Sequence, residues 1–363
     1  MTEVYLPNKL SDEPLLYGDT VFFDQLPSPH ESVRAALEAR VIGQKAVIDT
    51  IIDTLDASAL RNDTNRPLST FASIGPSGVG KTSSAHAIAD GMRRHGGGRL
   101  IKVNSTEYSE PYRISSLLGA SPGYVGREQK SLFRSLQSTQ IDGNGTVVLF
   151  DEIEKGSEEL HNLLLGILDD GELTDHSTGK ILDFRKTIVN LTSNIGSKEI
   201  SKALSCQDAQ SREEAYASAS ASAVEKFKDY FSPELVGRLD AILVFGTLGH
   251  VALRHILDLQ IDDTNVLSRR KYGVHVDVSE KARDHLVQSA VAESPEHGAR
   301  KLRSLLGQHV LSTVTRYATN AESVNGTRIY VGHVDEWTDI DTPATSPFVF
   351  SAIRDDSAKR TNY

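Results

Sequence analysis

A chain of 363 residues is too long to fold around one compact core, so we expect two or more folded units. Its formal net charge of −10 argues against a large nonspecific surface for nucleic acid, although a local basic channel is compatible with it. The single cysteine excludes an intramolecular disulfide and a cysteine-based metal cluster.

Residues 1 to about 30 combine Pro, Asp and Glu with scattered aromatic side chains, which indicates mostly irregular structure. They form the larger part of an N-terminal extension that we expect over residues 1–37. One interpretation is a solvated tail. The other is a segment within residues 1–30 that docks an adaptor, another partner or a neighbouring subunit, and composition does not separate the two. The chain shows neither a signal-peptide pattern nor an apolar run as long as a membrane span. We therefore expect a cytoplasmic protein without a membrane partner.

Helical spacing over residues 32–60, broken at Gly43, leads to the apolar stretch 71–74 and then to a glycine-rich loop. The loop and the start of the next helix comprise Gly75, Pro76, Ser77, Gly78, Val79, Gly80, Lys81 and Thr82. This order predicts a nucleotide phosphate site, in which backbone N–H groups cradle the phosphates, Lys81 supplies positive charge and the Thr82 hydroxyl ligates Mg²⁺. The alternative is a turn that only changes the direction of the chain.

Further apolar stretches at 100–103, 147–150 and 187–191 alternate with helical segments. They predict an α/β fold, a parallel sheet with helices on both faces. Asp151 and Glu152 follow a predicted strand and so lie at the edge where such sheets bind ligands. Asp151 is placed to hold Mg²⁺ through its water shell, and Glu152 to deprotonate the attacking water. A solvated strand end is the alternative for an acid pair taken alone.

A smaller, mainly helical unit is expected beyond a hinge at Gly246 and Gly249. Residues 251–267 and 279–292 have the spacing of helices, and residues 328–331 that of a strand. The last thirty residues are polar and contain two prolines, which indicates a loosely ordered tail.

Several further motifs occur in order along the chain. They are R-V-I-G-Q at 40–44, G-A-S-P-G-Y-V-G at 119–126, L-D-D-G-E-L-T-D at 168–175, D-F-R at 183–185 and L-T-S-N-I-G-S at 191–197. Together they resemble the motifs of the Clp-type AAA+ ATPases. The resemblance runs from about residue 38 to about residue 335, and points above all to the second ATPase module of ClpB-like disaggregases. It implies an AAA+ P-loop ATPase that binds ATP and Mg²⁺. Its parts are a large subdomain over 38–247, a small C-terminal subdomain over 248–335 and a tail over 336–363.

The same resemblance implies roles for single residues. Val41 and Ile42 contact the adenine, and Asn194 is the polar sensor that helps to position the attacking water. Arg238 resembles the arginine finger that reaches into the site of a neighbouring subunit, which implies a homo-hexamer. Arg300 resembles the second sensor, through which the small subdomain responds to nucleotide. From the residues alone, a turn remains the alternative for Asn194 and a surface ion pair for each arginine.

In this family a Gly-Tyr-Val-Gly loop lines the central pore of a ring. The resemblance places that loop at 123–126 and implies that Tyr124 and Val125 bind an extended polypeptide. A tyrosine suits the task, because its large amphipathic ring makes contacts that do not depend on the sequence of the client. A plain turn is the alternative.

The chain also departs from the family. Lys130 and Ser131 stand where ClpB-like chains have paired glycines, and Gly237 stands where they have the asparagine before the finger. One phosphate loop implies a single ATPase ring. The segment 200–230 lacks the Ile-Gly-Phe or Ile-Gly-Leu tripeptide of the protease-coupled relatives, so we expect no protease partner.

Together these features predict an ATP-driven protein unfoldase or remodelling chaperone, which hydrolyses ATP in a ring and moves a polypeptide client through its pore. Two alternatives remain open, a nucleic-acid motor or loader on the same core and an ATP-dependent assembly switch. The acidic balance and the aromatic pore loop count against nucleic acid as a partner.

Overall fold

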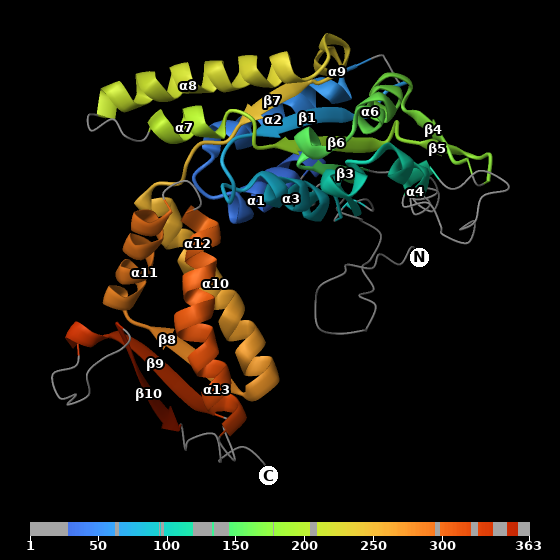
Figure 1. Cartoon of the computed structure of the whole chain (residues 1–363). Helices are drawn as coiled ribbons and strands as arrows, with labels where there is room; N and C mark the ends of the chain where they lie inside the picture. Colours follow the sequence, from blue (N-terminus) through green and yellow to red (C-terminus); the bar gives the residue numbers. More distant parts are fainter. Residues whose placement is uncertain are drawn as a thin grey trace, which may run out of the picture.

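The computed structural model describes most of the chain in two subdomains joined by a short hinge (Figure 1). The described residues are 28–61, 65–93, 95, 98–118, 133, 145–176, 178–203, 209–294, 298–320, 326–336 and 347–354. The predicted pore residues Tyr124 and Val125 lie outside them, as do residues 1–27 of the predicted docking segment. The end of the expected N-terminal extension is described, and it is helical from Pro29 onward. None of the described helices combines the length and the apolar character that crossing a membrane requires.

A five-stranded parallel sheet forms the centre of the large subdomain. Its strands are β1 (Ser69–Ile74), β2 (Leu100–Asn104), β3 (Thr146–Asp151), β6 (Thr187–Ser193) and β7 (Ala241–Val244), in the order β2-β3-β6-β1-β7. Every neighbouring pair runs parallel, which confirms the predicted fold class. Because the strands are parallel, β1, β3 and β6 end at one edge of the sheet, where ligands bind in such folds.

Helices cover both faces of this sheet. One face packs against α1 (Pro29–Arg40), α2 (Lys45–Ala59) and α3 (Lys81–Arg93), and the other against α6 (Glu158–Asp170), α7 (Ser197–Ala203), α8 (Ala209–Tyr230) and α9 (Pro233–Gly237). Strand β3 shows why, because successive side chains of a strand point to opposite faces. Val147 and Leu149 belong to the first core, whereas Val148 and Phe150 belong to the second.

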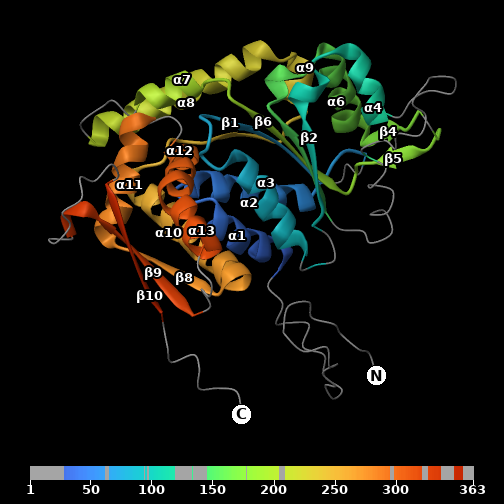
Figure 2. The same ribbon diagram turned by 60° about the horizontal axis from the view of Figure 1, so that its bottom comes forward.

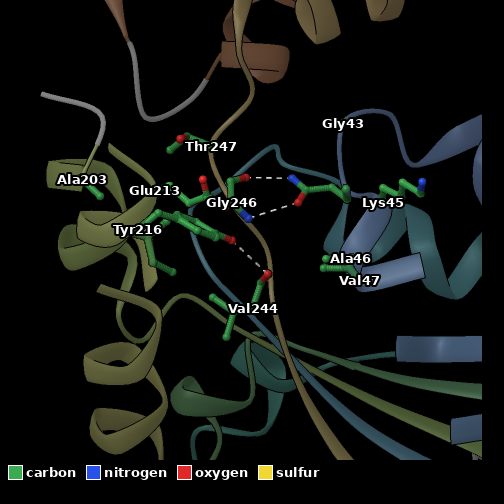
Figure 3. Close-up of a pocket in the computed structure, with 12 residues that line it drawn as sticks. Gly43, Lys45, Ala46, Val47, Ala203, Glu213, Tyr216, Val244, Gly246 and Thr247 are labelled. Carbon is green, nitrogen blue, oxygen red and sulfur yellow. Dashed lines mark hydrogen bonds between the residues drawn. The ribbon is translucent and has the colours of Figure 1, made fainter. Parts of the chain in front are cut away.

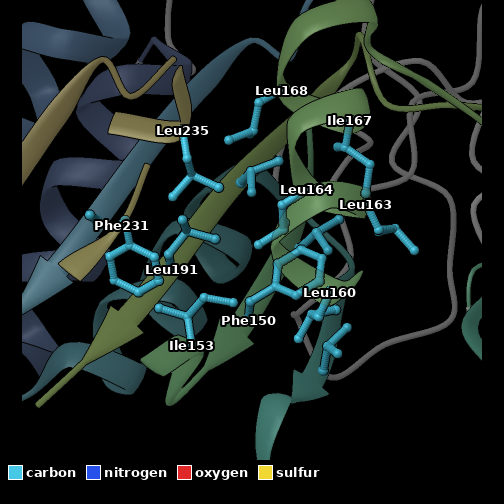
Figure 4. Close-up of a cluster of buried hydrophobic side chains, with 14 of the residues drawn as sticks. Phe150, Ile153, Leu160, Leu163, Leu164, Ile167, Leu168, Leu191, Phe231 and Leu235 are labelled. Atoms are coloured by element: carbon cyan, nitrogen blue, oxygen red, sulfur yellow. The ribbon is translucent and has the colours of Figure 1, made fainter. Parts of the chain in front are cut away.

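Helix α6 contributes an apolar stripe to the second core. The stripe comprises Leu160, Leu163, Leu164, Ile167 and Leu168, all buried, and Figure 4 shows these side chains around Phe150 and Leu191. Residues at this spacing share one helical face, so the sequence alone predicts the stripe. The helix ends where Gly171 adopts φ 63°, a left-handed conformation that glycine reaches without strain.

Short elements connect the strands of the large subdomain. They are η2 (Ser105–Tyr108), η3 (Pro111–Ile114), α4 (Ser115–Leu118), η5 (Ile153–Lys155) and a hairpin of β4 (Glu172–Thr174) and β5 (Ile181–Asp183). Their few residues carry too little periodicity to be predicted from the sequence.

The small subdomain has its own core between helices and a three-stranded sheet (Figure 2). Its elements are α10 (His250–Tyr272), β8 (Val274–Val278), α11 (Glu280–Glu293), α12 (Gly298–Leu305), η7 (Leu306–Leu311), α13 (Ser312–Asn320), β9 (Thr327–His333), η8 (Val334–Glu336) and β10 (Phe348–Arg354). The sheet has the order β10-β9-β8, and β10 pairs antiparallel with β9 along its whole length. Strand β10 falls in the segment expected to be a loose tail. Phe348 is buried in the core of the small subdomain, and this burial stabilises the docked strand.

Candidate active site

The predicted phosphate loop connects the end of β1 to the start of α3. Gly75, Gly78 and Gly80 have φ angles of 136°, 76° and 110°, a region that side chains with a Cβ rarely adopt. A Cβ on Gly75 would also lie 2.4 Å from the carbonyl oxygen of Phe245, so glycine is required there twice over. The Ser77 hydroxyl in this loop is buried, and it has no hydrogen-bond partner among the described residues. A buried polar atom without a partner indicates a missing polar ligand, and a phosphate group fits.

Lys81 is the central cation of the site. Its ammonium donates hydrogen bonds to the carbonyl oxygens of Gly75 at 2.5 Å and Pro76 at 2.6 Å, and to the Asn194 side-chain oxygen at 3.0 Å. Burial lowers the pKa of Lys81 to about 8, although the nearby carboxylates, Glu154 foremost, act in the opposite direction. All three ammonium protons are bound within the chain, so a phosphate has to compete with these acceptors for them.

Asp151 closes the other side of the site at the end of β3. Its carboxylate accepts hydrogen bonds from Thr192 at 2.5 Å and Thr82 at 3.3 Å, and it pairs with Lys102 at 2.6 Å. Burial raises the pKa of this carboxyl, but the bonds from Lys102 and Thr192 outweigh that effect, so the net shift is downward. Asp151 is therefore ionised at neutral pH and touches Thr82, as a shared Mg²⁺ site requires.

Glu152 has a strained backbone. Its φ of 56° is the only positive value at a non-glycine residue in the described part of the chain. Its carboxylate accepts from Lys155 at 2.6 Å and from the Asn194 side-chain amide at 3.5 Å. The ion pair with Lys155 lowers the pKa of Glu152, which keeps the side chain in the basic form that accepts a proton.

Glu154 also lies in this site, although none of the sequence motifs predicts a role for it. Its Oε1 atom accepts from the backbone N–H of Asn194 at 3.1 Å and from the side-chain amide at 3.3 Å. These bonds turn the amide nitrogen of Asn194 toward the carboxylates and its oxygen toward Lys81. The available signal was the spacing, since Glu154 follows Glu152 by two residues on η5. No comparable spacing points to Lys102 and Thr192, the two residues that bind the Asp151 carboxylate.

Val41 and Arg300 reach the phosphate loop from two sides. Val41 is buried, and its Cγ1 lies 3.5 Å from the position of a Cβ built on Gly80. Ile42, the next residue, is partly buried. Arg300 lies in the first turn of α12, and its charge acts with burial to lower the pKa of Lys81, although its effect is smaller than those of the nearby carboxylates. Val41 thus borders the phosphate loop, whereas the adenine contact of Ile42 and the sensor role of Arg300 stay predictions.

Arg238 lies elsewhere, at the opposite edge of the sheet. Its backbone carbonyl accepts from Arg66 at 2.6 Å and from Thr70 at 2.8 Å, beside the start of β1. The phosphate loop begins at the end of that strand, roughly 15–20 Å away at about 3.3 Å per residue. The guanidinium is half-exposed and pairs with Asp169 at 2.8 Å. Arg238 is therefore a predicted site residue that the structure places away from the phosphate loop of its own chain.

A pocket of about 410 Å³ lies beside the hinge (Figure 3). It is lined by the first turn of α2, by Tyr216 of α8 and by Gly246, and contains none of the predicted site residues. No group of three or more His, Cys, Asp and Glu side chains within the described ranges has the arrangement of a metal site. Thr82 and Asp151 alone supply too few ligands for a protein-only Mg²⁺ site, so they fit an ion that is also held by phosphates and water.

A strand, a glycine-rich loop closed by a buried lysine and a carboxylate pair two strands away define a P-loop nucleoside triphosphatase. Residues 66–242 match the family described as AAA domain (Cdc48 subfamily), and residues 248–331 match the C-terminal, D2-small domain of ClpB protein. The chain belongs to the Clp-type AAA+ ATPases.

Two curated relatives match over most of this chain. The ATP-dependent Clp protease ATP-binding subunit ClpC of Staphylococcus aureus (strain NCTC 8325 / PS 47) is 33% identical over 83% of this chain and 36% of its own length. Chaperone protein ClpB 1 of Synechocystis sp. is 35% identical over 82% of this chain and 32% of its own length. The chain thus spans about a third of the length of each relative that it matches.

Proposed function

We propose that this protein is an ATP-driven remodelling chaperone, which hydrolyses ATP in a homo-hexameric ring and moves a polypeptide through a central pore. The observation that carries the ATPase part is a set of contacts at one edge of the sheet, in which Asn194 bonds both Lys81 and Glu152, and Thr82 bonds Asp151. The name of the ClpB 1 relative, a chaperone, supports the remodelling part. A cytoplasmic location stays a prediction.

The residues divide the reaction among them. The loop N–H groups and Lys81 bind the outer phosphates, and Thr82 and Asp151 hold Mg²⁺, which would neutralise phosphate charge when bound. Glu152 accepts the proton of the attacking water, and Asn194 orients that water from between Glu152 and Lys81. Val41 and Ile42 pack against the adenine, and Arg300 lets the small subdomain respond to the bound nucleotide.

The position of Arg238 supports assembly. A half-exposed arginine at the far edge of the sheet is out of reach of the phosphate loop in its own chain. In a closed ring, the same surface faces the site of the next subunit, where a guanidinium stabilises the charge of phosphoryl transfer. We propose that Arg238 serves as this finger, so that a lone subunit hydrolyses ATP poorly.

The proposal also covers how the client is bound and whether a protease takes part. Tyr124 and Val125 are proposed to bind the client. Stand-alone remodelling follows from the missing docking tripeptide in residues 200–230, although the ClpC relative is named as a subunit of a protease.

The experiment that tests the function is Tyr124→Ala, assayed for ATP hydrolysis and for unfolding of a fluorescent protein without any protease present. We expect loss of unfolding with most of the hydrolysis kept, because the ring loses its contact with the client but not its active site. Tyr112→Ala is the matched control, since Tyr112 is an exposed tyrosine on η3. Unchanged unfolding would overturn the pore role, and ATP-dependent movement along nucleic acid or assembly without unfolding would favour the alternatives.

A further inference from the structure

Gln44 is a buried polar residue between the nucleotide loop and the hinge, and the mechanism above does not use it. Its side chain is 6% exposed and precedes α2 directly. The amide nitrogen donates to the carbonyl oxygen of Gly246 at 2.8 Å, and the amide oxygen accepts from the N–H of Gly246 at 3.1 Å. Figure 3 shows this pair of bonds as two dashed lines at Gly246. The side chain thus pairs with the backbone as a neighbouring strand would.

Gly246 marks the point where the chain leaves the large subdomain. Strand β7 ends at Val244, and α10 of the small subdomain starts at His250. On the side away from Gln44, a Cβ on Gly246 would lie 2.9 Å from the Tyr216 hydroxyl. The hinge backbone is therefore held between the Gln44 amide and the Tyr216 ring. A rotation of the small subdomain that turns the backbone at Gly246 has to strain or break the Gln44 bonds.

The same amide also contacts the phosphate loop. Its nitrogen donates a second bond, at 3.3 Å, to the carbonyl oxygen of Val79, which is itself buried. The two amide hydrogens thus go to two different carbonyls, one in the loop and one in the hinge. A shift of the Val79 carbonyl on nucleotide binding changes the position of the amide, and hence of Gly246, because a buried hydrogen bond is costly to leave unmade.

We infer that Gln44 is a positioning residue that couples the phosphate loop to the hinge, so that nucleotide binding sets the angle of the small subdomain. The inference rests on the proposed ATPase function only for its use in the cycle, since the coupling itself needs binding alone. Arg300 reads the nucleotide from the small subdomain, whereas Gln44 transmits from the large subdomain through the backbone.

The test compares Gln44→Glu with the unmodified residue. A glutamate has nearly the same shape and still accepts from the Gly246 N–H. When ionised, however, it presents an oxygen to both carbonyls in place of two donors. When protonated, it regains one donor, and burial beside carbonyls favours that form. We therefore expect the variant to lose coupling at pH 9 and to regain part of it at pH 6.

Hinge angle is read by energy transfer between dyes on Glu159→Cys and Arg270→Cys, two exposed positions in α6 and α10, with Cys206→Ser as background. On adding ADP, the unmodified Gln44 protein should change its transfer efficiency at both pH values. Gln44→Glu should bind ADP but show no such change at pH 9, with a kcat about tenfold lower, the effect of one lost buried hydrogen bond.

Tyr216→Phe is the matched control, because it removes the bond from Tyr216 to the Val244 carbonyl, at 3.4 Å, and leaves Gln44 intact. It should keep the ADP response. A full ADP response of Gln44→Glu at pH 9, or an equal loss in Tyr216→Phe, would overturn the coupling role. A protein that shows the ADP response but hydrolyses no ATP would overturn the proposed function and leave the coupling standing.

Discussion

Strand β1 has two ends with opposite electrostatics. At its carboxyl end, Lys81 is enclosed by its own loop and by three carboxylates, those of Asp151, Glu152 and Glu154. At its amino end, the guanidinium groups of Arg61 and Arg66 pair with the Asp240 carboxylate, and Arg66 also donates to the backbone carbonyl of Arg238. The guanidinium of Arg238 itself pairs with Asp169. The cation of the first end is thus surrounded by negative charge, whereas the three guanidinium groups of the second end outnumber the two carboxylates that pair with them.

The difference shows which parts of each end are rigid. Lys81 is buried, and its protons are shared with three fixed acceptors. Arg238 has a fixed backbone, but among the residues that the structure describes its guanidinium pairs only with the exposed Asp169, a kind of contact worth about 0–1 kcal/mol. The base of the side chain is thus held while its tip is free to move. A residue that has to reach a neighbouring subunit needs this combination.

The largest effect is expected for Arg238→Ala, which tests whether the amino end of β1 acts on the site of a neighbouring subunit. We expect ATP hydrolysis by the assembled protein to fall about a thousandfold, because an arginine finger supplies that order of rate enhancement. Lys81→Ala should be equally inactive, for a different reason. A mixture of the two variants should recover activity, since an intact Lys81 then faces an intact Arg238 across some boundaries. Inactive mixtures that still assemble would contradict a role in trans.

Glu152→Gln tests the site at the carboxyl end of strand β1 and leaves the amino end unchanged. The amide keeps the size of the side chain but does not accept a proton from water, so turnover should fall about a hundredfold. Binding of ATP, measured by calorimetry, should stay within a few-fold of the original. Normal hydrolysis in this variant would remove Glu152 from its assigned role and leave Glu154 as the remaining carboxylate beside Asn194.

Asp240→Asn tests the hydrogen bonds that fix the backbone at the amino end of strand β1. Asp240 accepts from Arg61 at 2.9 Å and from the Thr70 N–H at 2.8 Å. Replacing the carboxylate should lower the free energy of unfolding by about 2 kcal/mol, the range for charge-assisted hydrogen bonds. Urea denaturation measures this effect. Asp169→Asn is the control and should cost less than about 1 kcal/mol, because its pair is exposed. Equal losses would contradict the difference between the part-buried Asp240 pairs and the exposed Asp169 pair.

The smallest expected effect is a pH dependence of nucleotide binding. With a pKa of about 8, Lys81 is mostly charged at pH 7 and mostly neutral at pH 9. Phosphate binds the charged form, so affinity is lost as pH rises through 8, by about tenfold at pH 9. Calorimetry with ADP at the two pH values checks the prediction. Lys81→Arg should flatten the profile, because an arginine stays charged throughout. A flat profile with Lys81 in place would contradict the lowered pKa.

Local sequence signals predicted much of the fold and the part of the site that a single chain supplies. The glycine loop, the strand before Asp151 and the apolar stripe of α6 are each set by residues close together in the chain. The predicted strands at 71–74, 100–103, 147–150 and 187–191 are confirmed, each within β1, β2, β3 or β6. Strand β10 was not predicted, because its place depends on a core that other elements build.

Short segments with fixed geometry encode the class of protein and single out the residues that we propose bind the phosphates, so both could be predicted from the sequence. Packing of distant segments, in contrast, brings Glu154 to Asn194 and Gln44 to Gly246, 202 positions away. It alone places Arg238 at the opposite end of β1 from Lys81. These relations depend on strand order and on backbone groups brought together by packing, and neither leaves a periodic mark on the chain.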